Sequence, residues 1–242
     1  MERSEYETMA SVEDRHFWFV ATRAIVKDAV LAAGIRPDSA VLDVGCGTGG
    51  TMKALAGCCL LTGVEPHPPA AELAASRSGR PVVAGNALDL PFANGSFDGA
   101  LCLDVFEHIV DDRGAIEEIR RIVRPGGVLV ATVPCHPWLF SEHDEALHHV
   151  RRYTRKQFVG LLRRGGFVPE RVTWINSFLF PVAAAHRLAS RLLADHDAPA
   201  RSDAAVRLGP FNEALKAVFL AERRVLALTD LPFGLGLLAV AR

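Results

Sequence analysis

Short apolar runs alternate with segments of helical periodicity along most of the chain. The runs cover residues 40–44, 60–64, 82–84, 98–103 and 128–133. Continuous apolarity of this kind is typical of parallel strands, which are buried on both faces. Strands that alternate with helices therefore predict an α/β fold, with a parallel sheet between two layers of helices.

The segment before the fifth run has the clearest helical pattern. Its apolar residues recur at helical spacing, with charged residues between them: Ile116, Ile119, Ile122 and Val123. Pro125-Gly126-Gly127 follows, and we expect it to end the helix and lead into the strand.

The pattern changes after the fifth strand. Residues 135–153 are rich in His, Trp, Phe and Arg and have no clear period. A helix over 155–164 and strands near 167–175 and 235–241 complete the expected sheet of seven strands, most of them parallel. The intervening residues, 177–227, are Ala- and Leu-rich and predict a helical insert before the last strand.

Composition limits the class of protein. The chain has 242 residues, 50% of them hydrophobic and 23% charged, with a formal net charge of −1. We expect one globular domain over 1–242 and no nucleic-acid partner, since no excess of positive charge is present. The longest apolar stretch, 174–185, contains Asn176 and Pro181, so no transmembrane segment is expected.

The cysteines and the first residues favour a cytoplasmic protein. The cysteines are odd in number and lack C-x-x-C spacing: Cys46, Cys58, Cys59, Cys102 and Cys135. They are expected to be reduced and to pack as small apolar side chains. The charged start, Met1-Glu-Arg-Ser-Glu-Tyr-Glu7, lacks the apolar core of a signal peptide.

Glycines interrupt the chain directly after the first strand, in Val41-Leu-Asp-Val-Gly-Cys-Gly-Thr-Gly-Gly50. Gly45, Gly47 and Gly50 match the dinucleotide fingerprint G-x-G-x-x-G. Asp43 argues against a pyrophosphate there, because its carboxylate favours a cation. S-adenosylmethionine (SAM) carries an ammonium and a sulfonium, so it fits this turn; the other interpretation is that Asp43 caps the next helix.

Glu65 lies at the end of the second strand. A carboxylate at this position can accept hydrogen bonds from both ribose hydroxyls of an adenosine ligand. Nicotinamide enzymes share this feature, so Glu65 indicates an adenosine cofactor without specifying which one.

Taken together, the motifs resemble those of class I, Rossmann-like SAM-dependent methyltransferases, of the type 11-like small-molecule group. The resemblance runs from about residue 20 to 175. It rests on the glycine turn and on five further segments: Gly63-Val-Glu65, Gly85-Asn-Ala-Leu-Asp-Leu-Pro-Phe92, Gly95-Ser-Phe-Asp98, Asp104-Val-Phe-Glu-His108 and Arg121-Ile-Val-Arg-Pro-Gly-Gly127.

The resemblance implies a cofactor site that runs from the methionine portion, through the ribose and adenine, to the reaction centre. Its residues are Asp43, Gly45, Cys46, Gly47, Glu65, Asn86, Ala87, Leu88, Asp104 and Val105. Relatives usually have Asp in place of Asn86. An amide oxygen can still accept from the adenine amino group, but without a charge, so weaker binding is expected.

Residues 1–35 are expected to form an N-terminal helical lid. The aromatic-rich segment Val12-Glu-Asp-Arg-His-Phe-Trp-Phe19 resembles a helix that closes over SAM in relatives, and packing onto the sheet is an equal alternative. Arg23, one turn further on, can pair with the SAM carboxylate; a solvated arginine is the other interpretation.

The acceptor side is expected between residues 136 and 153, beyond the fifth strand. Methyl transfer depends mainly on positioning, and a base is needed only when the nucleophile must lose a proton. The candidate residues are His136, His143, Asp144, His148, His149 and Tyr153. We favour His149 as base, then His143, with Tyr153 as an orienting group; His108 is as readily a packing residue as a ligand contact.

The same histidines raise the question of a metal. Their H-x-x-x-x-H-H spacing lacks the helical i, i+4 pair and the C-x-x-C pattern of a firm metal site. The sequence therefore predicts no metal.

The insert 177–227 carries two apolar helical patterns. The first comprises Phe178, Leu179, Val182, Ala185, Leu188, Ala189, Leu192 and Leu193, and the second covers 214–228. A cap over the acceptor pocket is the preferred interpretation, with dimer contact or docking on a membrane surface as alternatives. Either a monomer or a homodimer is compatible with this pattern.

We therefore expect a SAM-dependent methyltransferase that acts on oxygen, nitrogen or carbon of a small or lipid-like acceptor. Three other hypotheses remain at this stage. One is a non-catalytic SAM-binding module that acts through its helical insert, another is an NAD(P)-dependent oxidoreductase, and the third is a membrane-peripheral lipid methyltransferase.

Overall fold

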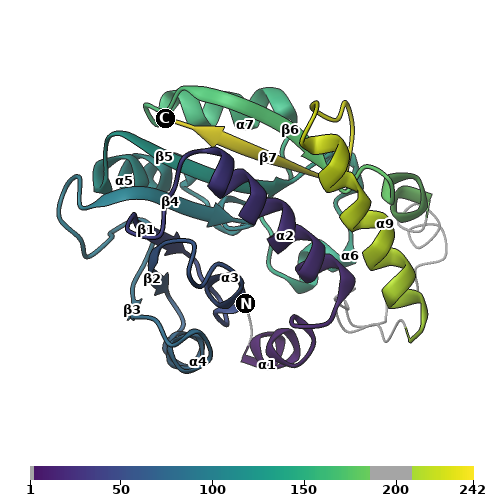
Figure 1. Ribbon diagram of the computed structural model, residues 1–242, viewed down its shortest axis with the longest axis horizontal. Helices are drawn as coiled ribbons and strands as arrows, with labels where there is room; N and C mark the ends of the chain where they lie inside the picture. The colour runs from purple at the N-terminus through teal and green to yellow at the C-terminus, as the bar shows by residue number, and fades with distance from the viewer. Residues whose placement is uncertain (1–2, 186–208) are drawn as a thin grey trace.

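A seven-stranded sheet forms the centre of the molecule, with the strand order β3-β2-β1-β4-β5-β7-β6 (Figure 1). The computed structural model describes residues 3–185 and 209–242. The strands are β1 (Ala40–Val44), β2 (Leu60–Glu65), β3 (Val82–Ala84), β4 (Phe97–Leu103), β5 (Val123–Pro134), β6 (Pro169–Ile175) and β7 (Gly236–Ala241). All are parallel except β7, which is antiparallel to both of its neighbours. The predicted Rossmann-like α/β class is confirmed.

Helices cover both faces of this sheet. They are α1 (Arg3–Val12), α2 (Phe17–Ala32), α3 (Gly50–Ala54), α4 (Pro68–Ser78), α5 (Asp112–Ile122), α6 (Glu142–Ala146), α7 (Arg155–Arg164) and α9 (Phe211–Leu226), with short 3-10 turns η1 (Phe106–His108) and η2 (Pro137–Leu139). One core lies beneath α5 and α7, and the other lies beneath α2, α3, α4 and α9. In Figure 1 α2 and α9 lie in front of the sheet and α5 and α7 behind it.

Strand β5 shows why the apolar runs are continuous. Leu129 and Ala131 belong to the core under α5 and α7, whereas Val128 and Val130 belong to the core on the opposite face. Since alternate side chains point to opposite faces of a strand, a strand buried on both faces needs apolar residues at every position.

The boundary between α5 and β5 differs from the prediction. Helix α5 ends at Ile122, and Val123 is already a strand residue that pairs with Phe97 on β4. The expectation that Val123 belongs to the helix, and that Pro125-Gly126-Gly127 ends it, is therefore wrong by a few residues. Pairing with β4 determines the boundary, and a register shift between Phe97 and Gly99 accommodates the irregular start of β5.

The order of the strands places a crevice at one edge of the sheet. From β1 the chain moves outward to β2 and β3, and then returns to β4 on the other side of β1. The loops after β1 and β4 consequently diverge, which is where open α/β sheets bind ligands. The glycine turn follows β1, and Asp104 follows β4.

The described part of the insert is tied to α2. Arg223 on α9 makes a bidentate ion pair with Asp28 on α2, at 2.7 and 2.8 Å, and Asn212 accepts a hydrogen bond from the Phe17 N–H at 2.9 Å. The second predicted helix is thus confirmed as α9. Of the first predicted apolar face, Phe178, Leu179, Val182 and Ala185 are described, whereas Leu188, Ala189, Leu192 and Leu193 lie outside the described residues.

Among residues 3–185 and 209–242, no helix combines the length and the apolarity that crossing a membrane requires.

Glu222 fixes the start of the insert to α9. Its carboxylate is fully buried and accepts the Phe178 N–H at 2.7 Å. Replacement by alanine leaves this N–H without an acceptor, so Glu222→Ala is expected to lower the free energy of unfolding by about 1–3 kcal/mol. Urea denaturation measures the change. Arg224→Ala, at an exposed position of the same helix, is the control and should change stability by less than about 0.5 kcal/mol; equal effects would contradict the anchoring role.

Candidate cofactor and acceptor site

A cavity of about 1030 Å³ opens where the loops after β1, β2 and β4 meet α1 and α2. Most of the predicted cofactor residues line it: Arg23, Gly45, Cys46, Gly47, Glu65, Asn86, Ala87, Leu88, Asp104 and Val105. Asp43 is not a lining residue and lies beneath the glycine turn. The structure thus gathers residues that are up to 82 positions apart into one wall.

The glycine turn brings the end of β1 close to the end of β4. Gly45 and Gly47 have φ values of +68° and +56°, which side chains rarely adopt. A Cβ on Gly45 would lie 2.7 Å from Cγ2 of Val105. Glycine is therefore required here for the backbone conformation and for the close approach to Val105.

Asp43 carries a buried oxygen that needs a partner. The residue is 2% exposed, and its Oδ2 has no hydrogen-bond partner among the residues that the structure describes. Burial raises the pKa of this carboxyl to about 7, with Glu65 adding to the shift and Arg23 opposing it. A carboxylate in this state fits a nearby cationic group better than it fits a phosphate.

Glu65 is poised at the tip of β2. Its Oε2 accepts the Gly47 N–H at 3.0 Å, and its Oε1 accepts from the Tyr6 hydroxyl at 2.8 Å and from the His67 N–H at 3.2 Å. A carboxylate offers about four acceptor positions, so at least one remains for a ribose hydroxyl. Movement of Tyr6, which belongs to α1, would free another.

The predicted adenine contacts lie on the next loop. Ala87 is buried, Leu88 is 40% exposed, and the Asn86 side-chain oxygen accepts the Leu88 N–H at 3.0 Å. This bond orients the amide and leaves its NH₂ group for other contacts.

Helix α1 covers the glycine turn through a buried ionic network. Glu13, 2% exposed, pairs with Arg23 of α2 and Arg77 of α4 and accepts the Thr48 hydroxyl at 2.5 Å. The Arg23 guanidinium also lies 5.6 Å from the Phe19 ring centre. Arg23 is therefore paired rather than solvated, and its partner here is Glu13.

One end of the cavity is polar and lies next to Val105. It contains Asp104, Glu107, His108, His143, His149 and Arg152. Asp104 has a positive φ of +53° and accepts the Thr132 hydroxyl at 3.1 Å. Burial raises the pKa of the Asp104 carboxyl.

His149 is held at this end by Asp144. The Nδ1 of His149 lies 2.9 Å from Oδ1 of Asp144, a fully buried carboxylate that also accepts from Arg152 at 2.8 Å and from the Ser141 N–H at 2.9 Å. With Asp144 as acceptor, Nδ1 carries the proton and Nε2 is left as the basic nitrogen. The geometry agrees with the choice of His149, and His143 lies beside it with a ring-centre separation of 6.4 Å.

The remaining candidates lie elsewhere. Tyr153 is 3% exposed, donates to Asp112 at 2.8 Å and does not line the cavity. Burial raises the pKa of its hydroxyl. His136 stacks on Trp174 and contacts the Gly234 carbonyl at 3.0 Å, and neither His136 nor His148 lines the cavity. The geometry therefore gives no support to Tyr153 as an orienting group.

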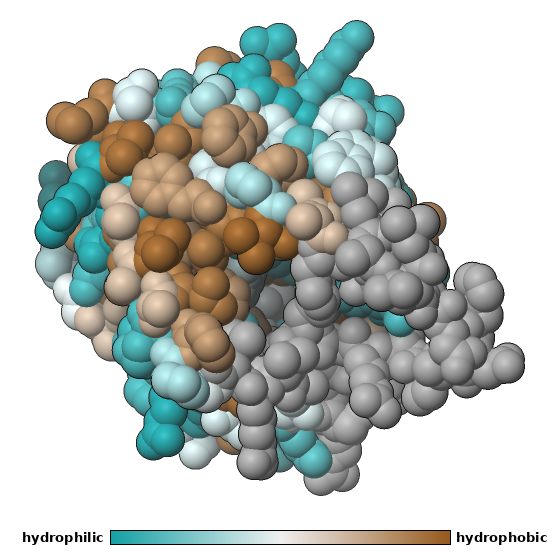
Figure 2. Space-filling view, turned by 90° about the vertical axis from the view of Figure 1, so that its right-hand side faces the viewer, coloured by the Kyte–Doolittle hydropathy of each residue, from teal (hydrophilic) through white to brown (hydrophobic). Residues whose placement is uncertain are grey.

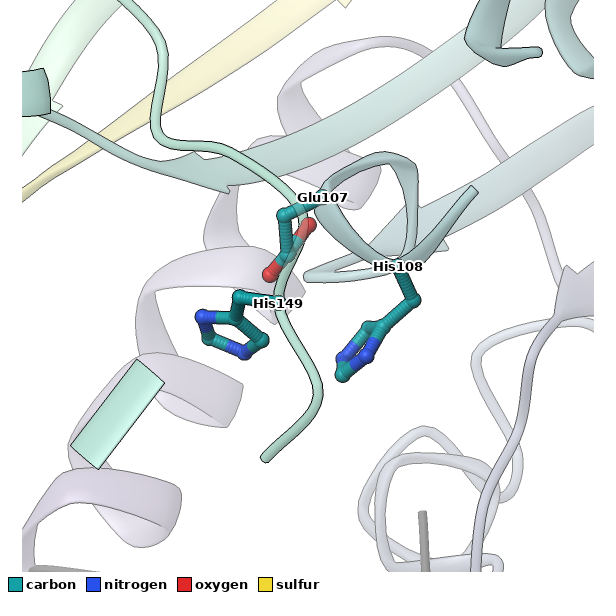
Figure 3. A group of neighbouring side chains, drawn as sticks. All are labelled: Glu107, His108 and His149. Carbon is teal, nitrogen blue, oxygen red and sulfur yellow. The ribbon is translucent and has the colours of Figure 1, made fainter. Parts of the chain in front are cut away.

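Glu107 is a site residue that the sequence did not indicate. It is fully buried and lies beside His108 and His149, with the three potential ligand atoms within 4.8 Å of one another (Figure 3). Burial and the neighbouring His149 lower the pKa of His108 to about 3. The motif Asp104-Val-Phe-Glu-His108 does contain a Glu-His pair that could have indicated Glu107 as a site residue. No spacing rule, however, predicts that this pair lies next to position 149.

The rest of the cavity wall is largely apolar. It is formed by Phe17, Trp18, Val26, Ile175, Leu179, Val182, Ala183, Leu215 and Leu235. Apolar side chains also gather on the outer face that carries α9 and the segment after β6 (Figure 2). Among them, Phe178 and Val182 are 43% and 67% exposed.

Comparison with known proteins identifies the class of this site. A family model described as a methyltransferase domain matches residues 42–131. An O-methyltransferase of Aspergillus sclerotiorum (resE) is 30% identical over 178 residues, covering 67% of each chain. An O-methyltransferase of Penicillium expansum (cnsE) is 40% identical over 108 residues, which span 40% of this chain and 39% of that protein.

A solved structure extends the likeness in fold. A SAM-dependent methyltransferase from Thermotoga maritima matches with a TM-score of 0.61 at 21% identity, covering 98% of this chain and 94% of the other. The chain belongs to the class I SAM-dependent methyltransferases, whose cofactor is S-adenosylmethionine. The orphaned oxygen of Asp43, the close turn at Gly45 and the free acceptor position on Glu65 fit this cofactor.

Because the pKa of Asp43 is about 7, binding of SAM should depend on pH. The cationic methionine end favours the ionised carboxylate, so affinity should rise by about fivefold between about pH 6 and pH 7, below the range in which the α-amino group of SAM loses its own proton. Calorimetric titration with SAM measures this change. Asp43→Asn should bind more weakly and without this pH dependence, and an unaltered profile in that variant would rule out Asp43 as the titrating group.

Glu65→Gln tests the ribose contact. The amide keeps the shape but loses the charge, which weakens hydrogen bonds from hydroxyl groups, so affinity for S-adenosylhomocysteine should fall by about 10-fold or more. Glu72→Gln, on the exposed face of α4, is the matched control and should bind as the unmodified protein does. A Glu65→Gln affinity equal to that of the control would show that Glu65 does not hold the ribose.

Proposed function

We propose that this protein transfers a methyl group from SAM to a hydroxyl oxygen of a small, largely apolar acceptor. The observation that carries the proposal is the His149–Asp144 pair at the polar end of an otherwise apolar cavity. A hydroxyl is the acceptor group that needs such a pair, because it must lose a proton during transfer.

In this proposal, a different group of residues would hold each part of the cofactor. Asp43 and the glycine turn would hold the methionine portion, with Arg23 available for its carboxylate once Glu13 yields. Glu65 would hold the ribose, and residues 86–88 the adenine. When bound there, SAM supplies an electrophilic methyl carbon on its sulfonium.

His149 would act as the base. Bound SAM would give its methyl group to the acceptor oxygen and leave as S-adenosylhomocysteine, and Nε2 of His149 would take the proton that the hydroxyl loses. Asp144 stabilises the resulting imidazolium and fixes its orientation through the 2.9 Å contact with Nδ1. His143 would line the path of the acceptor.

The apolar wall supports an acceptor with a hydrocarbon or aromatic body, including a lipid-like one. Trp18 and Leu179 belong to this wall, and they come from α2 and from the segment after β6. We infer that the described parts of the insert, 177–185 and 209–227, cap the acceptor side and that α1 closes the cofactor side, where Tyr6 contacts Glu65. Closure from both sides would exclude water from the reaction.

A non-catalytic SAM-binding module remains the competing hypothesis. It would keep the glycine turn and Glu65 but would have no use for a buried carboxylate that orients a cavity histidine. Cytoplasmic location is retained as a prediction, in agreement with five buried free cysteines.

Replacement of His149 tests the proposed role. His149→Asn should lower kcat for methyl transfer to a hydroxyl acceptor by about 10²–10⁴-fold, because the base is lost. Affinity for S-adenosylhomocysteine should stay the same, since His149 does not contact the glycine turn. Radiolabelled methyl transfer to a panel of phenolic and aliphatic alcohols provides the rate.

His148, the exposed neighbour of His149, provides the control. His148→Asn should retain the full rate of methyl transfer, because asparagine tolerates the φ of +57° at that position. Undiminished turnover in His149→Asn would exclude the base. Cofactor binding without transfer to any acceptor would favour the non-catalytic module.

A further inference from the structure

The side chains of Glu107, His108 and His149 converge at the polar end of the cavity (Figure 3). Their potential ligand atoms lie within 4.8 Å of one another. We propose that these three residues bind a divalent transition-metal ion, of which Zn²⁺ is the representative, in a site that opens onto the acceptor cavity. The expectation of no metal was based on the spacing within residues 136–153, and this group draws two of its three residues from η1.

The Glu107 carboxylate indicates a ligand most directly. It is 0% exposed, and both of its oxygens lack a hydrogen-bond partner within the described parts of the chain. Burying a carboxylate without partners costs several kcal/mol. A metal ion at this position would satisfy one or both oxygens, which no described side chain does.

Each histidine already has one ring nitrogen engaged by an outer partner. Nδ1 of His149 is bonded to Asp144 at 2.9 Å, and His108 donates to the backbone carbonyl of His148. Metal-binding histidines almost always have such a partner, which fixes the tautomer and directs the other nitrogen at the ion. Asp144 is itself held by Arg152 and Ser141, so the imidazole of His149 is firmly oriented.

The backbone keeps the two segments in register. The Val150 N–H donates to the Glu107 carbonyl at 2.8 Å, and the His149 N–H donates to the Asp144 carbonyl at 2.8 Å. Bonds of about 2.0–2.2 Å to a metal require ligand atoms closer than about 4.4 Å, so small rotations of the side chains suffice.

Charge and ligand type favour a transition ion over Mg²⁺ or Ca²⁺. Asp104 and Asp144 both lie near enough to Glu107 to interact with it electrostatically, and the facing cation, Arg152, is already paired with Asp144. A divalent ion would stabilise the ionised form of Glu107, which burial alone disfavours. Two imidazoles and one carboxylate suit Zn²⁺ or Fe²⁺, whereas Mg²⁺ and Ca²⁺ prefer oxygen ligands throughout.

The ion would also activate the acceptor in methyl transfer. This role of the metal rests on the proposed function. Three protein ligands leave coordination positions open toward the cavity, where an acceptor hydroxyl could bind and lose its proton more readily. Nε2 of His149 cannot hold a proton and a metal at the same time. In the metal-loaded protein the ion therefore takes over the activation that His149 alone would provide.

Direct measurement of metal binding tests the site without any acceptor. The full-length protein, dialysed against a chelator, is titrated with Co²⁺, and the visible absorption of the bound ion reports its coordination; Zn²⁺ is then added as competitor and Mg²⁺ as comparison. One equivalent of Co²⁺ should bind, be displaced by Zn²⁺ and be unaffected by Mg²⁺.

Three variants and one control locate the ligands. Glu107→Gln and His149→Asn should abolish the visible bands, and Asp144→Asn should weaken binding by about 10–100-fold. Glu145→Gln, an exposed acid on α6, should bind as the unmodified protein does. Retained S-adenosylhomocysteine binding verifies that each variant is folded.

The possible results separate the two proposals. No Co²⁺ binding by the unmodified protein, or binding that survives both Glu107→Gln and His149→Asn, overturns the metal site. Stoichiometric binding that those variants abolish supports it, even if no methyl transfer is found with any acceptor, a result that would count against the proposed function alone.

Discussion

Several carboxylates are buried around the cavity, and because a buried carboxylate is unfavourable without partners, each of them requires hydrogen-bond donors or a cation. Glu13 and Asp144 are both buried, and each is satisfied by arginine together with hydroxyl, imidazole or backbone donors. These two residues fix α1 over the glycine turn and His149 in the cavity. Asp43 and Glu107 are equally buried but keep oxygens without a described partner. Glu222 also keeps one such oxygen, but it does not line the cavity, whereas Glu107 does and Asp43 lies under the glycine turn that does. The unpartnered oxygens of Asp43 and Glu107 are therefore the ones within reach of a ligand in the cavity.

The sequence was sufficient to predict the sheet and most of the residues that gather around the glycine turn in one cavity. Both depend on local patterns: continuous apolar runs for strands buried on two faces, and glycines where the backbone adopts positive φ, as at Gly45. The residues of this group follow strand ends, so the strand order alone brings Glu65 and Asp104 to the same crevice. The start of β5 was predicted wrongly because local patterns do not contain the pairing between strands. Val123 becomes a strand residue through its pairing with Phe97.

The polar end of the cavity could not be predicted in the same way, because its contacts join segments without regular structure. His149 was chosen from the residue type and its place after β5, but its partnership with Asp144 depends on the path of the loop from Ser141 onward. Tyr153 faces Asp112 instead of the cavity for the same reason. Glu107 lies 42 positions before His149, and only the folded chain shows that they are neighbours.

The position of β7 has a consequence for the order in which the molecule folds. Within residues 3–185 and 209–242, strand β6 lies at the edge of the sheet and pairs only with β7. Strand β7 is inserted between β5 and β6, although it follows β6 by about sixty residues along the chain. Until residues up to Ala241 are available, β6 has no strand to pair with, and the edge of β5 stays open. Contacts between segments so distant in sequence form slowly and leave an unpaired, aggregation-prone edge in the meantime. Leu235, directly before β7, and Gly236, its first residue, also line the cavity, so the cavity wall is completed only when this late step has taken place.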